Sequence, residues 1–175
     1  MTRQPTGRVE HHDGRYDLFI DRTFAAPIED VWAAVTEPER LARWIGTWTG
    51  DPASGHVSFT MTAEEGMPTE EMEIRECDPP RALRVTSHVG DDQWHLDLVL
   101  TEHAGTTTLT FSQPGVDPEE AIDVGPGWEY YLDRLVAAET GGAVTDVDFE
   151  RDYVPGMAEH YRAQVAGARG GGPTG

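Results

Sequence analysis

Residues 127–142 read GWEYYLDRLVAAETGG, and this stretch decides how the rest of the chain must be arranged. Its large apolar side chains recur at the spacing that places residues on one face of a helix. The residues of that face are Trp128, Tyr131, Leu132, Leu135 and Val136. Pro126 and Gly127 favour a helix start, and Gly141 and Gly142 favour its end. Because so broad an aromatic face needs a large partner, we expect this helix to lie across a curved sheet.

Composition limits the classes of function. The chain has 175 residues and a formal net charge of -19, from 32 acidic and 13 basic residues. A chain of this length fits one domain with a real core, and its charge repels phosphates, so we expect no nucleic-acid or membrane partner. Every basic residue is an arginine, which excludes lysine chemistry such as a Schiff base. Cys77 is the only cysteine and the first residues lack an apolar signal segment, so we expect a cytoplasmic protein.

The pattern along the chain predicts one folded domain with two loose ends. We expect a flexible leader at 1–14, a domain at 15–142, an extension with a short helix at 143–166 and a disordered glycine-rich tail at 167–175. In the extension, Met157, Tyr161 and Val165 share one helical stripe. This stripe could dock on the domain or on a second subunit, so a homodimer stays open.

Alternating apolar and polar residues predict an antiparallel sheet. The first strand is expected at 15–24, followed by two short helices, of which the second carries a capping box formed by Thr36 and Glu39. Five further strands are expected near 57–62, 71–75, 83–86, 94–100 and 109–112. Short turns between them imply antiparallel pairing. The predicted class is therefore α+β, with a curved antiparallel sheet wrapped around one long C-terminal helix.

Four stretches of the chain resemble a known family. They are RTFAAPIEDVWAAVTEPERLARWIG at 22–46, CDPPRALRVT at 77–86, LTEHAGTTTLTFSQPG at 100–115, and the opening stretch at 127–142. The first and last are specific, whereas the middle two are generic strands and turns. Over about residues 15–142 the chain resembles the helix-grip fold of the SRPBCC, or START-like, superfamily. Within that superfamily it is similar to the family of activator of heat-shock protein 90 ATPase homologues.

The resemblance implies that the long helix closes a deep, mostly apolar cavity against the concave face of the sheet. We therefore expect a small hydrophobic or amphipathic ligand, such as a lipid, bound by apolar burial and a few polar contacts. No catalytic set is shared across the family, and we expect neither a cofactor nor a metal.

The expected lining has inward parity on the strands or lies on the inner face of a helix. Its residues are Trp44, Trp48, Phe59, Met61, Met72, Ile74, Val85, Ser87, Trp94, Leu96, Leu98, Phe111, Gln113, Trp128, Tyr131, Leu132 and Leu135. Ser87, Gln113 and the hydroxyl of Tyr131 are the expected polar anchors. Aromatic and methionine stripes more often fill solid cores, so only an unfilled space would favour a ligand site.

Two other functions stay open. The family resemblance also suggests a co-chaperone-like protein-interaction module, although its eukaryotic members carry a separate N-terminal domain for which we expect no room here. Related helix-grip proteins include polyketide cyclases and lyases, in which case Tyr131 or a histidine would be the acid or base. The sequence does not decide whether the protein is an enzyme. The HEXXH, GXSXG and Walker motifs are all absent from it.

Histidines and carboxylates offer weaker candidate sites. His88 and His95 flank a turn, but no third metal ligand is evident, and His11 and His12 fall in the leader. Acidic residues cluster at 64–65 and 70–73, and the parity of this last strand points Glu71 and Glu73 outward, as on a solvated face. We therefore expect no metal centre, and no titratable pair on the inner sheet face.

Overall fold

The computed structural model describes residues 3–154 and 156–170, and it contains one antiparallel sheet crossed by a long helix. The strand order is β1-β2-β8-β7-β6-β5-β4-β3. The strands are β1 (Arg8–His12), β2 (Arg15–Phe24), β3 (Thr47–Thr49), β4 (His56–Thr60), β5 (Thr69–Asp78), β6 (Ala82–Val89), β7 (Asp92–His103) and β8 (Thr106–Pro114). All seven neighbouring pairs are antiparallel, which confirms the predicted sheet.

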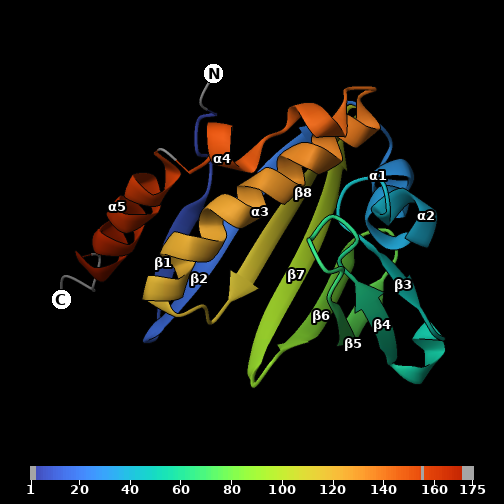
Figure 1. Ribbon diagram of the computed structural model, residues 1–175, viewed down its shortest axis with the longest axis horizontal. Helices are drawn as coiled ribbons and strands as arrows, with labels where there is room; N and C mark the ends of the chain where they lie inside the picture. Colours follow the sequence, from blue (N-terminus) through green and yellow to red (C-terminus); the bar gives the residue numbers. More distant parts are fainter. Residues whose placement is uncertain (1–2, 155, 171–175) are drawn as a thin grey trace.

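Helices cover one face and one flank of the sheet. They are α1 (Ile28–Thr36), α2 (Pro38–Leu41), α3 (Pro118–Glu139), α4 (Phe149–Asp152) and α5 (Met157–Gly170), with short 3-10 turns at Pro52–Ser54 and Val144–Asp146. The long helix α3 crosses the sheet, α1 and α2 lie near one end of it, and α5 lies beyond β1 (Figure 1). This arrangement is the helix-grip fold predicted from the sequence.

Helix α3 begins earlier than predicted. It starts at Pro118 and includes Pro126, which the sequence suggested as its first turn. Asp117 caps this earlier start, because its carboxylate accepts hydrogen bonds from the backbone N–H groups of Glu119 (2.9 Å) and Glu120 (3.2 Å). Pro126 lacks an N–H group and therefore omits only one bond of the helical ladder.

The second short helix does not use the predicted capping box. Its N-cap is Glu37, and no side chain caps it. The hydroxyl of Thr36 instead donates to the carbonyl of Trp32 (2.7 Å), one turn back in α1. The predicted capping box is therefore wrong, although the helix itself forms.

The two chain ends are more ordered than predicted. Residues 8–12, expected to belong to a flexible leader, form β1 and pair with β2. Residues 167–170, expected to be disordered, continue α5, while residues 171–175 lie outside the described part of the chain. Met157, Tyr161 and Val165 are buried within this chain, where α5 packs on α3 and β1. Among the described helices, none combines the length and apolar composition that crossing a membrane requires.

Candidate functional site

An unfilled cavity of about 290 Å³ lies between α3 and the sheet. Strands β4 to β8 form its floor, and Trp128, Tyr131 and Leu132 of α3 form its roof. One end is closed by residues of α1, α2 and the segment that follows them, among them Trp44 and Trp48. The lining is almost entirely apolar, as expected of a small-molecule site.

Most of the expected lining residues surround this cavity. They are Trp44, Trp48, Phe59, Met61, Met72, Ile74, Val85, Ser87, Trp94, Leu96, Leu98, Phe111, Trp128, Tyr131 and Leu132. Gln113 and Leu135 do not line it. Leu135 is fully buried in the core, and Gln113 is buried with its side-chain oxygen accepting a hydrogen bond from Nε1 of Trp128 (2.9 Å). Gln113 is thus a positioning partner of the Trp128 ring and not a polar group of the cavity.

Aromatic rings meet around Trp128. Its ring centroid lies 4.6 Å from that of Phe111 on the floor, and 6.4 Å from those of Trp94 and Tyr131. These are tilted or edge-to-face pairs, the arrangements that aromatic quadrupoles favour. The roof and the floor therefore touch where Trp128 meets Phe111 of β8 and Trp94 of β7.

Some lining residues were not predicted. They are Val35, Thr36, Leu41, Ile45, Pro52, Val57, Glu70, Cys77 and Leu83. Glu70 matters most, because it places a carboxylate in the wall and accepts a hydrogen bond of 2.6 Å from the hydroxyl of Ser87. Its parity with Met72 and Ile74 on β5 was the available signal. Cys77 reaches the lining because the β5–β6 register shifts between Ile74 and Glu76, which strict alternation does not anticipate.

Tyr131 behaves as a hydrogen-bond donor. Burial, and then its hydrogen bond to the carboxylate of Glu64, raise the pKa of the Tyr131 hydroxyl far above its ordinary value. A phenol held protonated in this way cannot serve as a general base near neutral pH. No histidine is among the described residues that line the cavity. The structure therefore disfavours Tyr131 as the base of a cyclase-like enzyme and places no histidine among the described lining residues, whereas a role of Tyr131 as the acid stays untested.

The histidines beside the β6–β7 turn form no metal centre in this structure. Nδ1 of His95 lies 3.0 Å from the hydroxyl of Thr86, so the two share a hydrogen bond across the strand pair. Within residues 3–154 and 156–170, no three His, Cys, Asp or Glu side chains are grouped as a metal ion would require.

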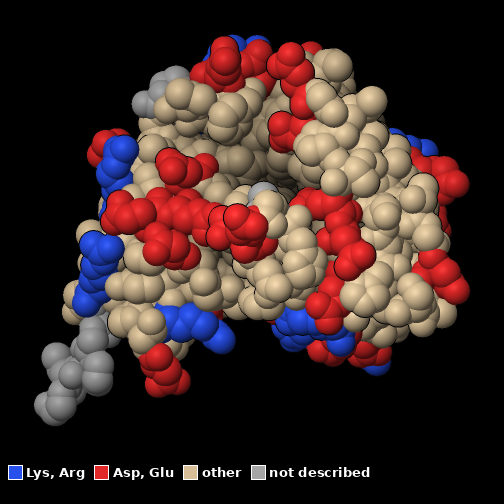
Figure 2. All heavy atoms as spheres, turned by 60° about the horizontal axis from the view of Figure 1, so that its bottom comes forward, with Lys and Arg blue, Asp and Glu red and all other residues tan. Residues whose placement is uncertain are grey.

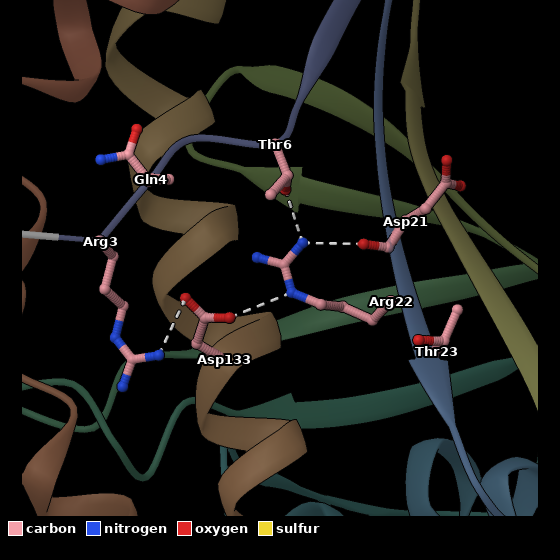
Figure 3. Close-up of a pocket in the computed structure, with 7 residues that line it drawn as sticks. All are labelled: Arg3, Gln4, Thr6, Asp21, Arg22, Thr23 and Asp133. Atoms are coloured by element: carbon pink, nitrogen blue, oxygen red, sulfur yellow. Dashed lines mark hydrogen bonds and ion pairs between the residues drawn. The ribbon is translucent and has the colours of Figure 1, made fainter.

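A second, polar depression lies on the other side of α3. It has a volume of about 360 Å³ and is lined by Arg3, Gln4, Thr6, Asp21, Arg22, Thr23 and Asp133. Figure 3 shows the guanidinium of Arg22 between Thr6 and the backbone of Asp21 on one side and Asp133 on the other. Since these charged groups already bind one another, the depression offers a ligand little that is unpaired.

Beneath that depression, a buried carboxylate joins three parts of the chain. Glu129 of α3 accepts hydrogen bonds from the N–H groups of Thr6 and Gly7 (both 2.7 Å), from Tyr161 of α5 (2.7 Å) and from Arg22 of β2 (2.8 Å). Burial works to raise the pKa of Glu129, but these hydrogen bonds outweigh it and the pKa is lowered. The group is therefore a structural anchor for α3.

Solved structures share this fold. The crystal structure of CalU16 from Micromonospora echinospora is 23% identical, with a TM-score of 0.68 over 93% of this chain and 98% of that one. EF2215 from Enterococcus faecalis is 19% identical, with a TM-score of 0.68 over 93% and 91%. DynU16, from the dynemicin biosynthetic locus, is 28% identical, with a TM-score of 0.62 over 73% of this chain and 49% of its own. These likenesses confirm the helix-grip architecture.

Sequence comparison identifies the family. No curated protein matches the chain. The sequence model described as "Activator of Hsp90 ATPase homolog 1-like protein" matches residues 25–139, from the first residue after β2 to the last residue of α3. Since this match covers more than half of the chain and includes the elements that enclose the cavity, the protein belongs to the family of Activator of Hsp90 ATPase homolog 1-like proteins.

Proposed function

We propose that the protein binds a small apolar or amphipathic molecule in the cavity under α3. The observation that carries this proposal is the unfilled volume of about 290 Å³ among almost entirely apolar side chains. Apolar side chains normally pack against one another, and an apolar wall that faces water instead forfeits burial and dispersion energy. A guest would recover that energy.

The lining also suits an adaptable site. Met61 and Met72 contribute flexible thioether side chains, and the aromatic rings around Trp128 offer rigid flat surfaces. The likeness to DynU16, which comes from a biosynthetic locus, supports a small molecule as the ligand. Apolar burial would supply most of the binding energy.

Binding can be measured with an uncharged fluorescent dye. N-phenylnaphthylamine should bind with a blue-shifted emission, and the intrinsic fluorescence of the lining tryptophans should change in parallel. Replacing Leu96, which lines the cavity, by tryptophan should abolish the signal by filling the space.

Val99→Trp is the matched control, because Val99 lies on the same strand with the opposite parity. It should leave dye binding intact. Equal loss in both variants, or no binding to the parent protein, would contradict the proposal.

The family description supports a second function, a protein-interaction module that acts on the Hsp90 chaperone. If this is correct, the protein should bind Hsp90 in sedimentation experiments and raise its ATPase rate. Leu96→Trp separates the two functions, because it should block the cavity while leaving an interaction through the outer surface unchanged.

A further inference from the structure

Three of the tryptophans that line the cavity donate their indole N–H groups to partners in the protein. Nε1 of Trp44 donates to the carbonyl of Ala34 (3.0 Å), and Nε1 of Trp48 donates to the carbonyl of Thr36 (2.8 Å). Nε1 of Trp128 donates to Gln113. A ligand that used any of these three donors would have to break the bond that engages it.

The hydroxyl groups are occupied in the same way. Thr36 donates to the carbonyl of Trp32, Ser87 donates to Glu70, and Tyr131 donates to Glu64. Six donors of the wall are thus engaged in hydrogen bonds within the protein, whereas the carboxylate of Glu70 in the same wall is an acceptor. This imbalance disfavours a ligand that carries an acceptor, such as a carboxylate.

Glu70 is the one carboxylate among the described residues that line the cavity. Its Oε2 accepts the hydrogen bond of the buried Ser87, and among the described residues no donor or cation binds its Oε1. Ser87 lies opposite Met72 on β5 and opposite Trp94 on β7. The carboxylate therefore lies near the aromatic side chains of the floor, where a cation can contact an anion and a ring face together.

Positive charge is missing from the wall. The chain has no lysine, and no arginine or histidine is among the described residues that line the cavity. Arg134 of α3 is engaged elsewhere, with the carbonyl of Trp44 (2.8 Å) and the hydroxyl of Tyr130 (3.2 Å). In the space-filling view a hollow on the surface is bordered by carboxylates, and the arginines lie toward the outline (Figure 2).

Resting on the proposed function, we infer that the cavity selects ligands that join a protonated amine to an apolar, aromatic body, with Glu70 as the counter-ion. Glu70 is partly buried in an apolar wall, and an ammonium group that entered the cavity would form a charge-assisted hydrogen bond with its carboxylate. An anionic ligand such as a fatty acid would meet the same carboxylate and be repelled.

Three compounds that share one aromatic body test this inference. Naphthylethylamine, naphthylethanol and naphthylacetic acid are titrated into the protein at neutral pH by calorimetry. The amine should bind about 10- to 100-fold more tightly than the alcohol, as expected for a charge-assisted hydrogen bond. The acid should bind most weakly.

Two single substitutions remove the same charge from opposite faces of β5. Glu70→Gln keeps an acceptor for Ser87 and should reduce amine affinity to that of the alcohol. Glu71→Gln is the control, because Glu71 is 65% exposed on the other face and lies 3.5 Å from His56. It should keep the preference for the amine. Circular dichroism and thermal unfolding report whether each variant folds.

The possible outcomes separate this inference from the proposed function. If the amine has no advantage in the parent protein, or if Glu70→Gln keeps that advantage, the inference is wrong while ligand binding stands. If the uncharged dye also fails to bind, the proposed function is wrong as well. The comparison of amine and alcohol in the parent protein remains decisive even if Glu70→Gln does not fold.

Discussion

The hydroxyl of Tyr161 donates a hydrogen bond of 2.7 Å to the buried carboxylate of Glu129, and so joins α5 to α3. Neither residue lines the cavity, but Glu129 lies one residue after Trp128 of its roof. The ring of Tyr161 is packed so closely that a methyl group on either Gly7 or Gly125 would overlap it. The final helix therefore supports the roof of the cavity from outside.

Removing that hydroxyl should weaken the fold. Tyr161→Phe deprives a buried carboxylate of one donor, and we expect the free energy of unfolding to fall by about 2 kcal/mol. Urea denaturation measures it. Tyr16→Phe, at a half-buried ring that stacks on His11, should change it by less than about 1 kcal/mol, and equal effects would contradict a special role for Tyr161.

Replacing each of two glycines of α3 by alanine should change the stability of the protein in opposite directions. A Cβ at Gly125 would lie 2.7 Å from ring atoms of Tyr161, so Gly125→Ala should destabilise the protein by about 1–3 kcal/mol. A Cβ at Gly127 meets nothing within 4 Å, so Gly127→Ala should stabilise it by about 0.5–1 kcal/mol through helix propensity. Thermal unfolding of both variants measures these changes. A change of stability in the same direction for both variants would be inconsistent with the packing described.

Glu129 should make stability depend on acid pH. Its pKa is lowered in the folded state, so its contribution is complete above its ordinary value of 4.5 and is lost as the pH falls through the folded pKa. Glu129→Gln should therefore cost about 3 kcal/mol at neutral pH, and the gap from the parent should narrow below pH 4.5. Urea denaturation at several pH values tests this.

A control on the same helix isolates the effect of burial. Glu119→Gln removes a carboxylate from the same helix without removing a buried contact, because 76% of the Glu119 side chain is exposed. The Glu119→Gln curve of stability against pH should run parallel to that of the parent protein. A constant gap between the parent and Glu129→Gln at every pH would refute the lowered pKa.

The hydrogen bond between Tyr131 and Glu64 should order the segment between β4 and β5. Because Glu64 is exposed, Tyr131→Phe should lower the free energy of unfolding by only about 1 kcal/mol, but hydrogen exchange should accelerate in residues 61–68. Tyr130→Phe is the control, because its hydroxyl contacts Arg134 instead. Unchanged exchange in Tyr131→Phe would show that other contacts hold the segment.

The architecture was predictable because apolar residues recur at every second position in the strands and at every third or fourth position in the helices. The alternation of apolar and polar residues predicted β2 and the strands from β4 to β8. The apolar stripe from Trp128 to Leu135 predicted the C-terminal half of α3. The start of α3 was missed because Pro126 looks like a helix start, whereas the observed N-cap is Asp117. The short edge strands β1 and β3 carry too few apolar residues to show a period.

The site was predictable where side-chain parity holds. Inward parity on the strands correctly predicted that Met72, Val85 and Leu96 line the cavity. The shifted register after Ile74 also places Cys77 in the lining, which parity alone does not predict. Gln113 has the inward parity, but its side chain accepts a hydrogen bond from Trp128 and does not line the cavity. The sequence could not show this, because the parity of one strand does not give the position of a ring on the helix above it. Glu70 follows the same parity, but an acidic residue beside Glu71 resembles a solvated surface.

The register shift in β5 also places a residue that can be labelled chemically in the wall of the cavity. Cys77 is the sole thiol of the chain, and it lies in the wall of the cavity. A small thiol-reactive fluorophore attached there would mark one defined position without any engineered change elsewhere. The native sequence thus carries its own attachment point for following the arrival and departure of a guest in real time.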